Sequence, residues 1–310
     1  MKKLYQIFGL FLLCCLLGQA QAAYNEGFRK CAECHEAEVD VWKDTKHSKS
    51  FNEVHKKDEA VKILTAVGGE KNMRQNATCV TCHYTEIKTS ETSKSQVATG
   101  PSCESCHGAS SGWREIHNNY GEGIKDASKE APSNKSKRIA DATKAGMIWP
   151  SMTYDVASNC MQCHGLTQSK IASDTYEKMI VAGHPGELEF ELVKYSQGTV
   201  RHRFYPPNVN TNAEMTQSEL ARMFIVGKAA QLISAVSAVR DAANPKYAEL
   251  QKKREQDSRS ALQLVADVPE VKALLDKPSH EAGRKLSDAL KTKDLYDKVK
   301  GVLPAKSTYK

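Results

Sequence analysis

The chain has 310 residues, with 44 basic residues against 37 acidic ones, ten cysteines and ten histidines. Hydrophobic residues make up 40% of it and charged residues 26%, which excludes a wholly disordered chain and a polytopic membrane protein. Only 7% of the residues are aromatic, so we expect something other than side chains to fill part of the interior.

Residues 1–22 have the three-part pattern of a secretory signal peptide. Two lysines follow the first Met, residues 8–17 form an apolar run, and Ala-Gln-Ala at residues 20–22 is a small-x-small cleavage site. The apolar run is shorter than the roughly 20 residues of a membrane-spanning helix. We expect the signal to be removed with Cys14 and Cys15. The mature chain is then periplasmic, or alternatively extracellular, without a membrane span.

Eight cysteines remain in the mature chain, and each belongs to a C-x-x-C-H motif. The cysteine pairs are Cys31 and Cys34, Cys79 and Cys82, Cys103 and Cys106, and Cys160 and Cys163; the histidines that follow them are His35, His83, His107 and His164. This pattern is the attachment signal of c-type haem. Two cysteines one helical turn apart reach the two vinyl groups of a porphyrin, and the adjacent histidine lies under the iron as its proximal ligand. The sequence predicts four covalently bound haem c groups.

Two other uses of paired cysteines fit the sequence less well. The second and third motifs together have the C-x2-C-x20-C-x2-C spacing of a structural zinc site. Disulfide bonds would suit an exported chain. Neither alternative explains why a histidine follows every pair.

The haems change the charge of the protein. Loss of Lys2 and Lys3 with the signal lowers the basic residues from 44 to 42, against 37 acidic ones. Four haems then add eight propionate carboxylates, which makes the holoprotein near neutral or slightly acidic. The basic sequence therefore does not indicate nucleic-acid binding.

Residues 23–206 hold all four motifs and form the predicted tetrahaem domain. At about 45 residues per haem, the chain is too short to build an independent core around each one. We therefore expect four haems packed against one another, with short helices and loops between the motifs. Helices are expected over residues 36–52 and 58–66, and residues 121–144 are expected to be an exposed connection.

Residues 207–310 contain no cysteine and have a different pattern. Thr-Gln-Ser-Glu at residues 216–219 is a capping box that opens a long apolar-periodic helix, which the sequence ends at Asn244-Pro245. The helices expected here cover residues 220–243, 246–266, 269–275 and 279–290. The fold class is thus mainly α, a multihaem cytochrome c with a C-terminal helical bundle. We expect this bundle to be a structural cap or docking surface, with a homo-oligomer as one way to cover its apolar face.

Six other histidines are available as distal iron ligands: His47, His55, His117, His184, His202 and His280. Local context favours His47, one short helix after the first motif, His117, ten residues after the third, and His184, which Gly and Pro flank. His55 and His202 are the alternative distal ligands for a fourth iron, and Met73 is a less favoured candidate. We expect His280 at the surface.

The segment Trp42-Lys43-Asp44-Thr45-Lys46-His47 follows the first motif, and two motifs 24 residues apart come next, the second ending in His107-Gly108. This arrangement, over residues 27–184, resembles the tetrahaem cytochrome c-554 family. The resemblance implies a periplasmic electron carrier of the kind that accepts electrons from hydroxylamine oxidoreductase. It also implies three bis-histidine haems, with His47, His117 and His184 as distal ligands, and a five-coordinate haem at His83.

Three functions follow from these features. The first is electron transfer between redox partner proteins, because bis-histidine irons have no free position for a substrate. The second is an enzyme that acts on nitrite, hydroxylamine or nitric oxide at a five-coordinate haem, although the chain has no C-x-x-C-K motif. The third is a subunit of a polymeric cytochrome wire, in which a neighbour supplies a distal histidine. We expect the electron carrier rather than the enzyme.

Overall fold

The computed structural model describes residues 22–186, 189–206, 208–242 and 244–310, so most of the expected signal peptide lies outside the described residues. It is mainly helical, with 58% helix and 3% strand, as the sequence predicts. In chain order the elements, with η for 3-10 helices, are α1 Phe28–Ala32, α2 Glu36–Lys43, α3 Lys46–Glu53, η1 Val54–Lys56, α4 Asp58–Val67, α5 Ala77–His83, β1 Thr85–Ile87, β2 Gln96–Thr99, α6 Cys103–His107, η2 Ser110–Gly112, α7 Arg114–His117, η3 Ala127–Lys129, α8 Pro132–Lys144, α9 Thr153–His164, α10 Ser173–Val181, α11 Leu192–Ser196, α12 Gln217–Asp241, α13 Pro245–Gln263, α14 Pro269–Asp276, α15 His280–Leu290, α16 Tyr296–Val299 and η4 Lys306–Thr308.

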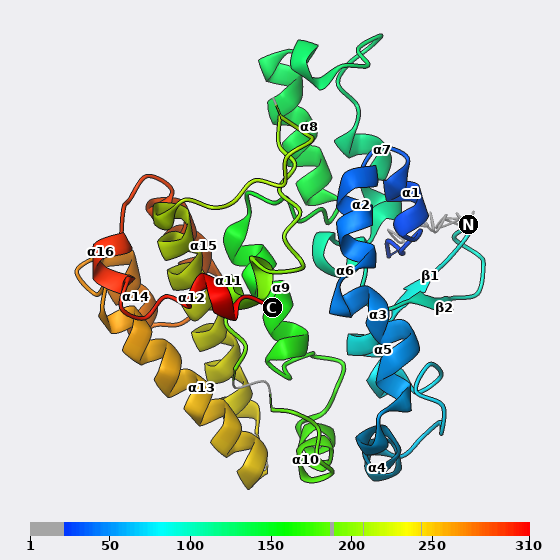
Figure 1. Ribbon diagram of the computed structural model, residues 1–310, viewed down its shortest axis with the longest axis vertical. Coiled ribbons are helices and arrows are strands. Elements are labelled where there is room, and N and C mark those ends of the chain that lie inside the picture. The colour runs from blue at the N-terminus through cyan, green and yellow to red at the C-terminus, as the bar shows by residue number, and fades with distance from the viewer. Residues whose placement is uncertain (1–21, 187–188, 207, 243) are drawn as a thin grey trace, which may run out of the picture.

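The arrangement places α9 between two groups of elements (Figure 1). On one side lie the short helices α1 to α7 and the antiparallel pair β1–β2, in which Ile87 pairs with Gln96. On the other side lie the long helices α12 and α13, with α14 and α16 beyond them, and α15 packs on α9, α12 and α14. Three motifs lie on the first side, and the fourth ends α9 in the middle of the molecule.

The helix expected over residues 36–52 is interrupted. It breaks at Asp44 and Thr45, where α2 ends and α3 begins. The Thr45 hydroxyl accepts a hydrogen bond from the backbone N–H of Ser48 at 3.2 Å and donates one to the Trp42 carbonyl at 2.7 Å. A threonine that caps a new helix in this way ends the preceding one. The break sets the direction of α3, which carries His47.

The expectation of an exposed connection over residues 121–144 is wrong in its second part. Residues 132–144 form α8, which starts with Pro132 in its first turn, a position that proline favours. Ala142 of α8 is fully buried and packs in a cluster with Trp113 and Met147. The many Lys and Ser residues of α8 suggested a loop. Ala142 and Arg138 hold the helix in place, because Arg138 pairs with Glu130 at 2.7 Å and donates to the His117 carbonyl at 2.6 Å.

The C-terminal helices begin and end close to the expected positions. The capping box forms, because the Thr216 hydroxyl accepts from the Glu219 N–H at 3.3 Å while the Glu219 carboxylate accepts from the Thr216 N–H at 2.8 Å. The helix that follows, α12, is long and apolar enough to cross a membrane, but 67% of its apolar window is buried inside the protein. Such burial is typical of a central core helix.

One hydrophobic core crosses the expected domain boundary at residue 206. Tyr154 and Met161 of α9 belong to the same buried cluster as Phe224 and Ile225 of α12 and Leu262 of α13. The C-terminal helices therefore pack directly on the helix that ends in the fourth motif.

Gly283 of α15 marks the closest of these contacts. A Cβ atom added there would lie 2.1 Å from Cε2 of Tyr154, a side chain that is 1% exposed. We expect Gly283→Ala to lower the free energy of unfolding by about 1–3 kcal/mol through overpacking, as measured by denaturant titration. Gly301→Ala is the control, because nothing lies within 4 Å of its added Cβ. Equal stability of the two variants would contradict this packing.

Candidate haem-binding site

Each proximal histidine faces a second histidine ring. The centroid distances are 6.4 Å for His35 and His117, 5.9 Å for His164 and His47, 6.0 Å for His83 and His184, and 6.2 Å for His107 and His202. Two imidazoles that share a metal ion at bonds of about 2 Å place their centroids roughly 6 Å apart. All four pairs therefore have the separation that one iron between two imidazoles requires.

Hydrogen bonds orient the rings of these pairs. In each of four rings the Nδ1 atom lies within hydrogen-bond distance of a backbone carbonyl oxygen. The distances are 2.5 Å from His117 to Arg114, 2.9 Å from His184 to Pro185, 2.6 Å from His202 to Val200 and 2.9 Å from His107 to Ile148. A carbonyl oxygen only accepts, so Nδ1 carries the proton and Nε2 keeps its lone pair free. This is the usual outer-shell arrangement of a metal-ligating histidine.

Burial keeps several of these rings neutral. It lowers the pKa of His47 to about 4, with the neighbouring His164 adding to the shift. Burial also lowers the pKa of His107 and of His117. Neutral imidazole is the form that binds a metal ion.

The conformation of the loop that carries His184 depends on Gly183. Gly183 has φ of 102°, in the left-handed region where a side chain is strained. Its N–H donates to the Ile180 carbonyl at 3.1 Å, and the His184 N–H donates to the Met179 carbonyl at 2.9 Å. These two bonds form a Schellman motif that ends α10 and turns His184 towards the second motif.

The motifs lie side by side in two pairs. The Cys31 thiol is hydrogen-bonded to that of Cys103, which raises the pKa of Cys31. The Cys82 thiol is likewise hydrogen-bonded to that of Cys163, and its pKa is raised. The cysteines of the described residues are free of disulfide bonds. The first motif therefore neighbours the third, and the second neighbours the fourth.

Several buried nitrogen atoms beside the motifs fit the carboxylates of haem. Nδ1 of His55 and Nε of Arg74, Arg201 and Arg203 are buried and have no hydrogen-bond partner within the described chain. Arg201 and Arg203 flank His202, and Arg74 lies beside Tyr84, which follows His83. Buried donors are nearly always paired, and the propionates of haem are acceptors of the kind these positions need.

A buried carboxylate, which sequence reasoning missed, joins the first and third motifs. Glu104 lies between the cysteines of the third motif and is 4% exposed. Its oxygens accept from the N–H groups of Glu26 at 2.8 Å, Gly27 at 2.7 Å and Ser110 at 3.0 Å, and from the Ser110 hydroxyl at 2.5 Å. An acid inside a C-x-x-C-H motif was the available signal, but the motif alone does not say whether it is buried.

The other candidate residues lie apart from the proximal rings. Among the described residues, His55 makes no ring contact with a proximal histidine. Met73 is buried in a cluster with Cys79 and Val80. His280 is exposed, as expected, and its Nδ1 lies 2.9 Å from the Tyr154 hydroxyl. In the part of the chain that the structure describes, no three His, Cys, Asp or Glu side chains converge as in a metal-ion site.

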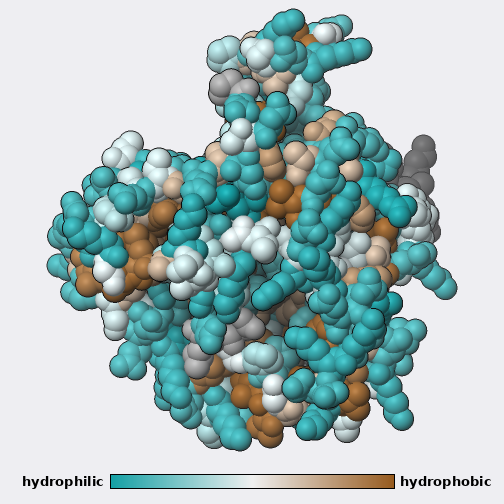
Figure 2. Space-filling view, in the orientation of Figure 1, coloured by the Kyte–Doolittle hydropathy of each residue, from teal (hydrophilic) through white to brown (hydrophobic). Residues whose placement is uncertain are grey.

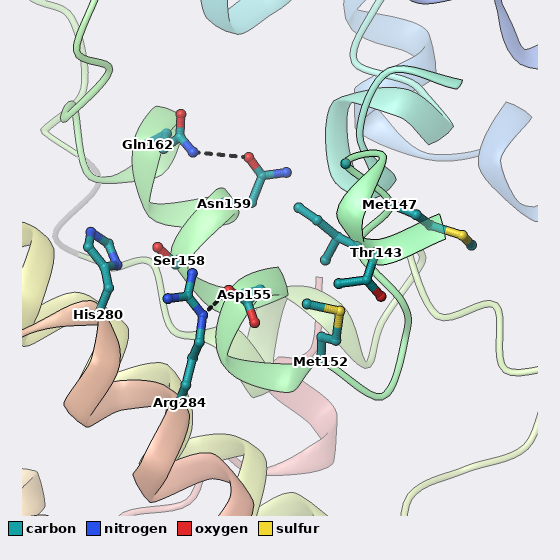
Figure 3. Close-up of a pocket in the computed structure, with 11 residues that line it drawn as sticks. Thr143, Met147, Met152, Asp155, Ser158, Asn159, Gln162, His280 and Arg284 are labelled. Atoms are coloured by element: carbon teal, nitrogen blue, oxygen red, sulfur yellow. Dashed lines mark hydrogen bonds and ion pairs between the residues drawn. The ribbon is translucent and has the colours of Figure 1, made fainter. Parts of the chain in front are cut away.

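A cavity of about 550 Å³ lies between α9, α15 and the turn after α8. Figure 3 shows Asp155 of α9 pointing to Arg284 of α15, with which it forms an ion pair at 2.8 Å. Asn159, on the same side of α9, donates to the carbonyl of Ser105 at 2.7 Å. These contacts fix the fourth-motif helix between the third motif and the C-terminal helices.

Comparison with known proteins gives matches for part of the chain. The family model described as "Cytochrome c554 and c-prime" matches residues 30–108. Cytochrome c-554 of Nitrosomonas europaea is 31% identical over 156 residues, which are 47% of this chain and 61% of that protein. The chain thus matches less than two thirds of that relative's length. No solved structure matches.

Proposed function

We propose that this chain is a tetrahaem electron-transfer protein with two histidine ligands at every iron. The match of residues 30–108 to the cytochrome c554 and c-prime family model supports c-type haem as the cofactor. The cysteines of the four motifs attach the haems. The axial pairs are His35 with His117, His47 with His164, His83 with His184, and His107 with His202.

The observation that carries the proposal is the facing ring at every proximal histidine. Saturated irons have no position for a substrate, so the pairing favours electron transfer over chemistry on a small nitrogen compound. The c-554 resemblance implied an open iron at His83, but the ring of His184 lies 6.0 Å from that of His83. His202 occupies the place opposite His107, which the resemblance had left to another histidine.

Bound haem supplies one-electron chemistry between Fe(III) and Fe(II). A reduced redox protein would give one electron and an oxidised redox protein would receive it, with no bond made or broken. The chain's own residues hold the haems in fixed places, and the contacts between motifs one and three and between two and four support short transfer distances. Since each axial pair forms within one chain, a polymer is not needed to complete a site.

Docking of the redox partners would use small and transient interfaces. Hydrophilic side chains cover most of the face in Figure 2, and hydrophobic ones show as separate patches. Such a surface suits brief encounters rather than a permanent complex. The signal-peptide pattern supports export, which places these partners in the periplasm.

Mass spectrometry of the mature protein tests the haem count. We expect the mass of a chain that starts at Ala23 plus four haems, because all four motifs are complete. Peptide mapping should place one haem on each cysteine pair. A motif that stays unmodified when the other three are loaded would overturn the tetrahaem proposal.

A further inference from the structure

Arg254 of α13 lies buried against the end of α9. Its side chain is 2% exposed. Nη1 donates to the Gly165 carbonyl at 3.1 Å and to the Gln251 side chain at 2.6 Å, while Nη2 donates to the Ser234 hydroxyl at 3.0 Å and to the Met161 sulfur at 3.2 Å. The guanidinium group is thus held within the chain by neutral partners.

No carboxylate among the described residues forms an ion pair with Arg254. The nearest acid that acts on it is Asp257, and Asp257 is itself paired with Lys228 at 2.5 Å. Burial lowers the pKa of Arg254 to about 10, so the group stays charged at neutral pH. The protein therefore keeps an uncompensated positive charge in its interior, which normally costs several kcal/mol.

Capping of α9 does not by itself explain a charge at this position. The Gly165 carbonyl already accepts from Gln251 at 2.9 Å, and the Leu166 carbonyl accepts from the Tyr247 hydroxyl at 2.6 Å. Both donors are neutral and buried. A third neutral donor would complete the helix end without the cost of a buried cation.

The place of Arg254 relative to the fourth motif suggests a role for its charge. Its guanidinium contacts Met161 and Gly165, the residues on either side of Cys163 and His164 in the sequence. His164 is held from another direction by Phe190, whose ring stacks on it at a centroid distance of 4.3 Å. A fixed charge therefore contacts the helical turn that carries Cys163 and His164.

We propose that Arg254 raises the reduction potential of the haem attached at Cys160 and Cys163. Reduction makes this haem one charge more negative, and a fixed positive charge in a medium of low polarity stabilises the reduced state. The inference rests on the haem attachment proposed above. Arg254 thus increases the affinity of the fourth haem for an electron through its charge.

Three variants of the full, haem-loaded protein separate charge from structure. Arg254→Met removes the charge at similar volume, and Arg254→Lys keeps it with a different shape. Tyr247→Phe removes the neutral donor to the Leu166 carbonyl at the same helix end and is the matched control. Potentiometric titration followed in the visible spectrum gives the four midpoint potentials, and NMR of the haem methyl groups identifies the haem that changes.

For Arg254→Met we expect one haem to lose about tenfold in its ratio of reduced to oxidised form at a fixed potential, a shift of about 59 mV to lower potential. Arg254→Lys should retain most of the wild-type value. Tyr247→Phe should lower stability and leave all four potentials in place.

Unchanged potentials in Arg254→Met would overturn the inference and leave Arg254 a helix cap. A shift of equal size in Tyr247→Phe would also overturn it, because structure rather than charge would then set the potential. Both results would leave the proposed function intact. An unloaded motif in the wild-type protein would instead count against the proposed function.

Discussion

Replacing His184 with leucine should convert one of four low-spin haems into a five-coordinate, high-spin haem. The ring of His184 faces that of His83 at 6.0 Å, and its Nδ1 bond to the Pro185 carbonyl points Nε2 to the space between the rings. Without it the second-motif iron keeps only its proximal ligand. The reduced variant should then bind carbon monoxide at one iron per chain, whereas the wild-type protein should bind none.

Two control variants accompany this prediction. His280→Leu should leave the visible spectrum unchanged, because His280 is exposed and contacts Tyr154. His55→Leu should also preserve four low-spin haems, since His55 faces no proximal ring in the described part of the chain. An unchanged spectrum in His184→Leu would remove His184 from the axial ligands. A high-spin haem in His55→Leu would assign His55 a ligand role.

Replacing Glu104 with alanine should lower the free energy of unfolding by about 3–5 kcal/mol. The substitution leaves three backbone N–H groups without their acceptor in a buried site. The Ser110 hydroxyl keeps the Glu26 carboxylate as an acceptor at 3.0 Å. That carboxylate does not replace Glu104 for the three N–H groups, because it is paired with Arg114 at 2.8 Å, and the hydrogen bond from Arg114 holds the pKa of Glu26 below its usual value. Denaturant titration of the haem-loaded protein measures the loss.

Glu33→Ala is the matched control for Glu104→Ala. Glu33 also lies between the cysteines of a motif, but it is exposed and only 3.5 Å from the exposed Lys30. Such surface pairs contribute about 0–1 kcal/mol. Similar losses in the two variants would contradict the buried carboxylate as the link between the first and third motifs.

The sequence predicts how the haems are attached better than it predicts which histidines face each other across an iron. A C-x-x-C-H motif contains the attachment residues and the proximal ligand in five consecutive positions, so local spacing is sufficient. A distal ligand comes from elsewhere in the chain: His117 faces His35 and His47 faces His164. Only the tertiary fold decides such a pairing.

The same limit applies to the boundary at residue 206 and to Arg254. The change in composition predicts the C-terminal helices, because capping and apolar period are local signals. It does not predict that Phe224 and Tyr154 share one core. Arg254 stands in a highly charged helix where a solvated side chain is the ordinary expectation, and only the packing of α13 on α9 buries it.

Electron paramagnetic resonance of the fully oxidised protein tests the central proposal, two histidine ligands at every iron, most directly. Low-spin and high-spin ferric haems give separate signals that can be integrated. We predict low-spin signals that account for four irons per chain and no high-spin signal. A high-spin signal of one iron per chain would contradict the four histidine pairs and would leave an open site for substrate chemistry.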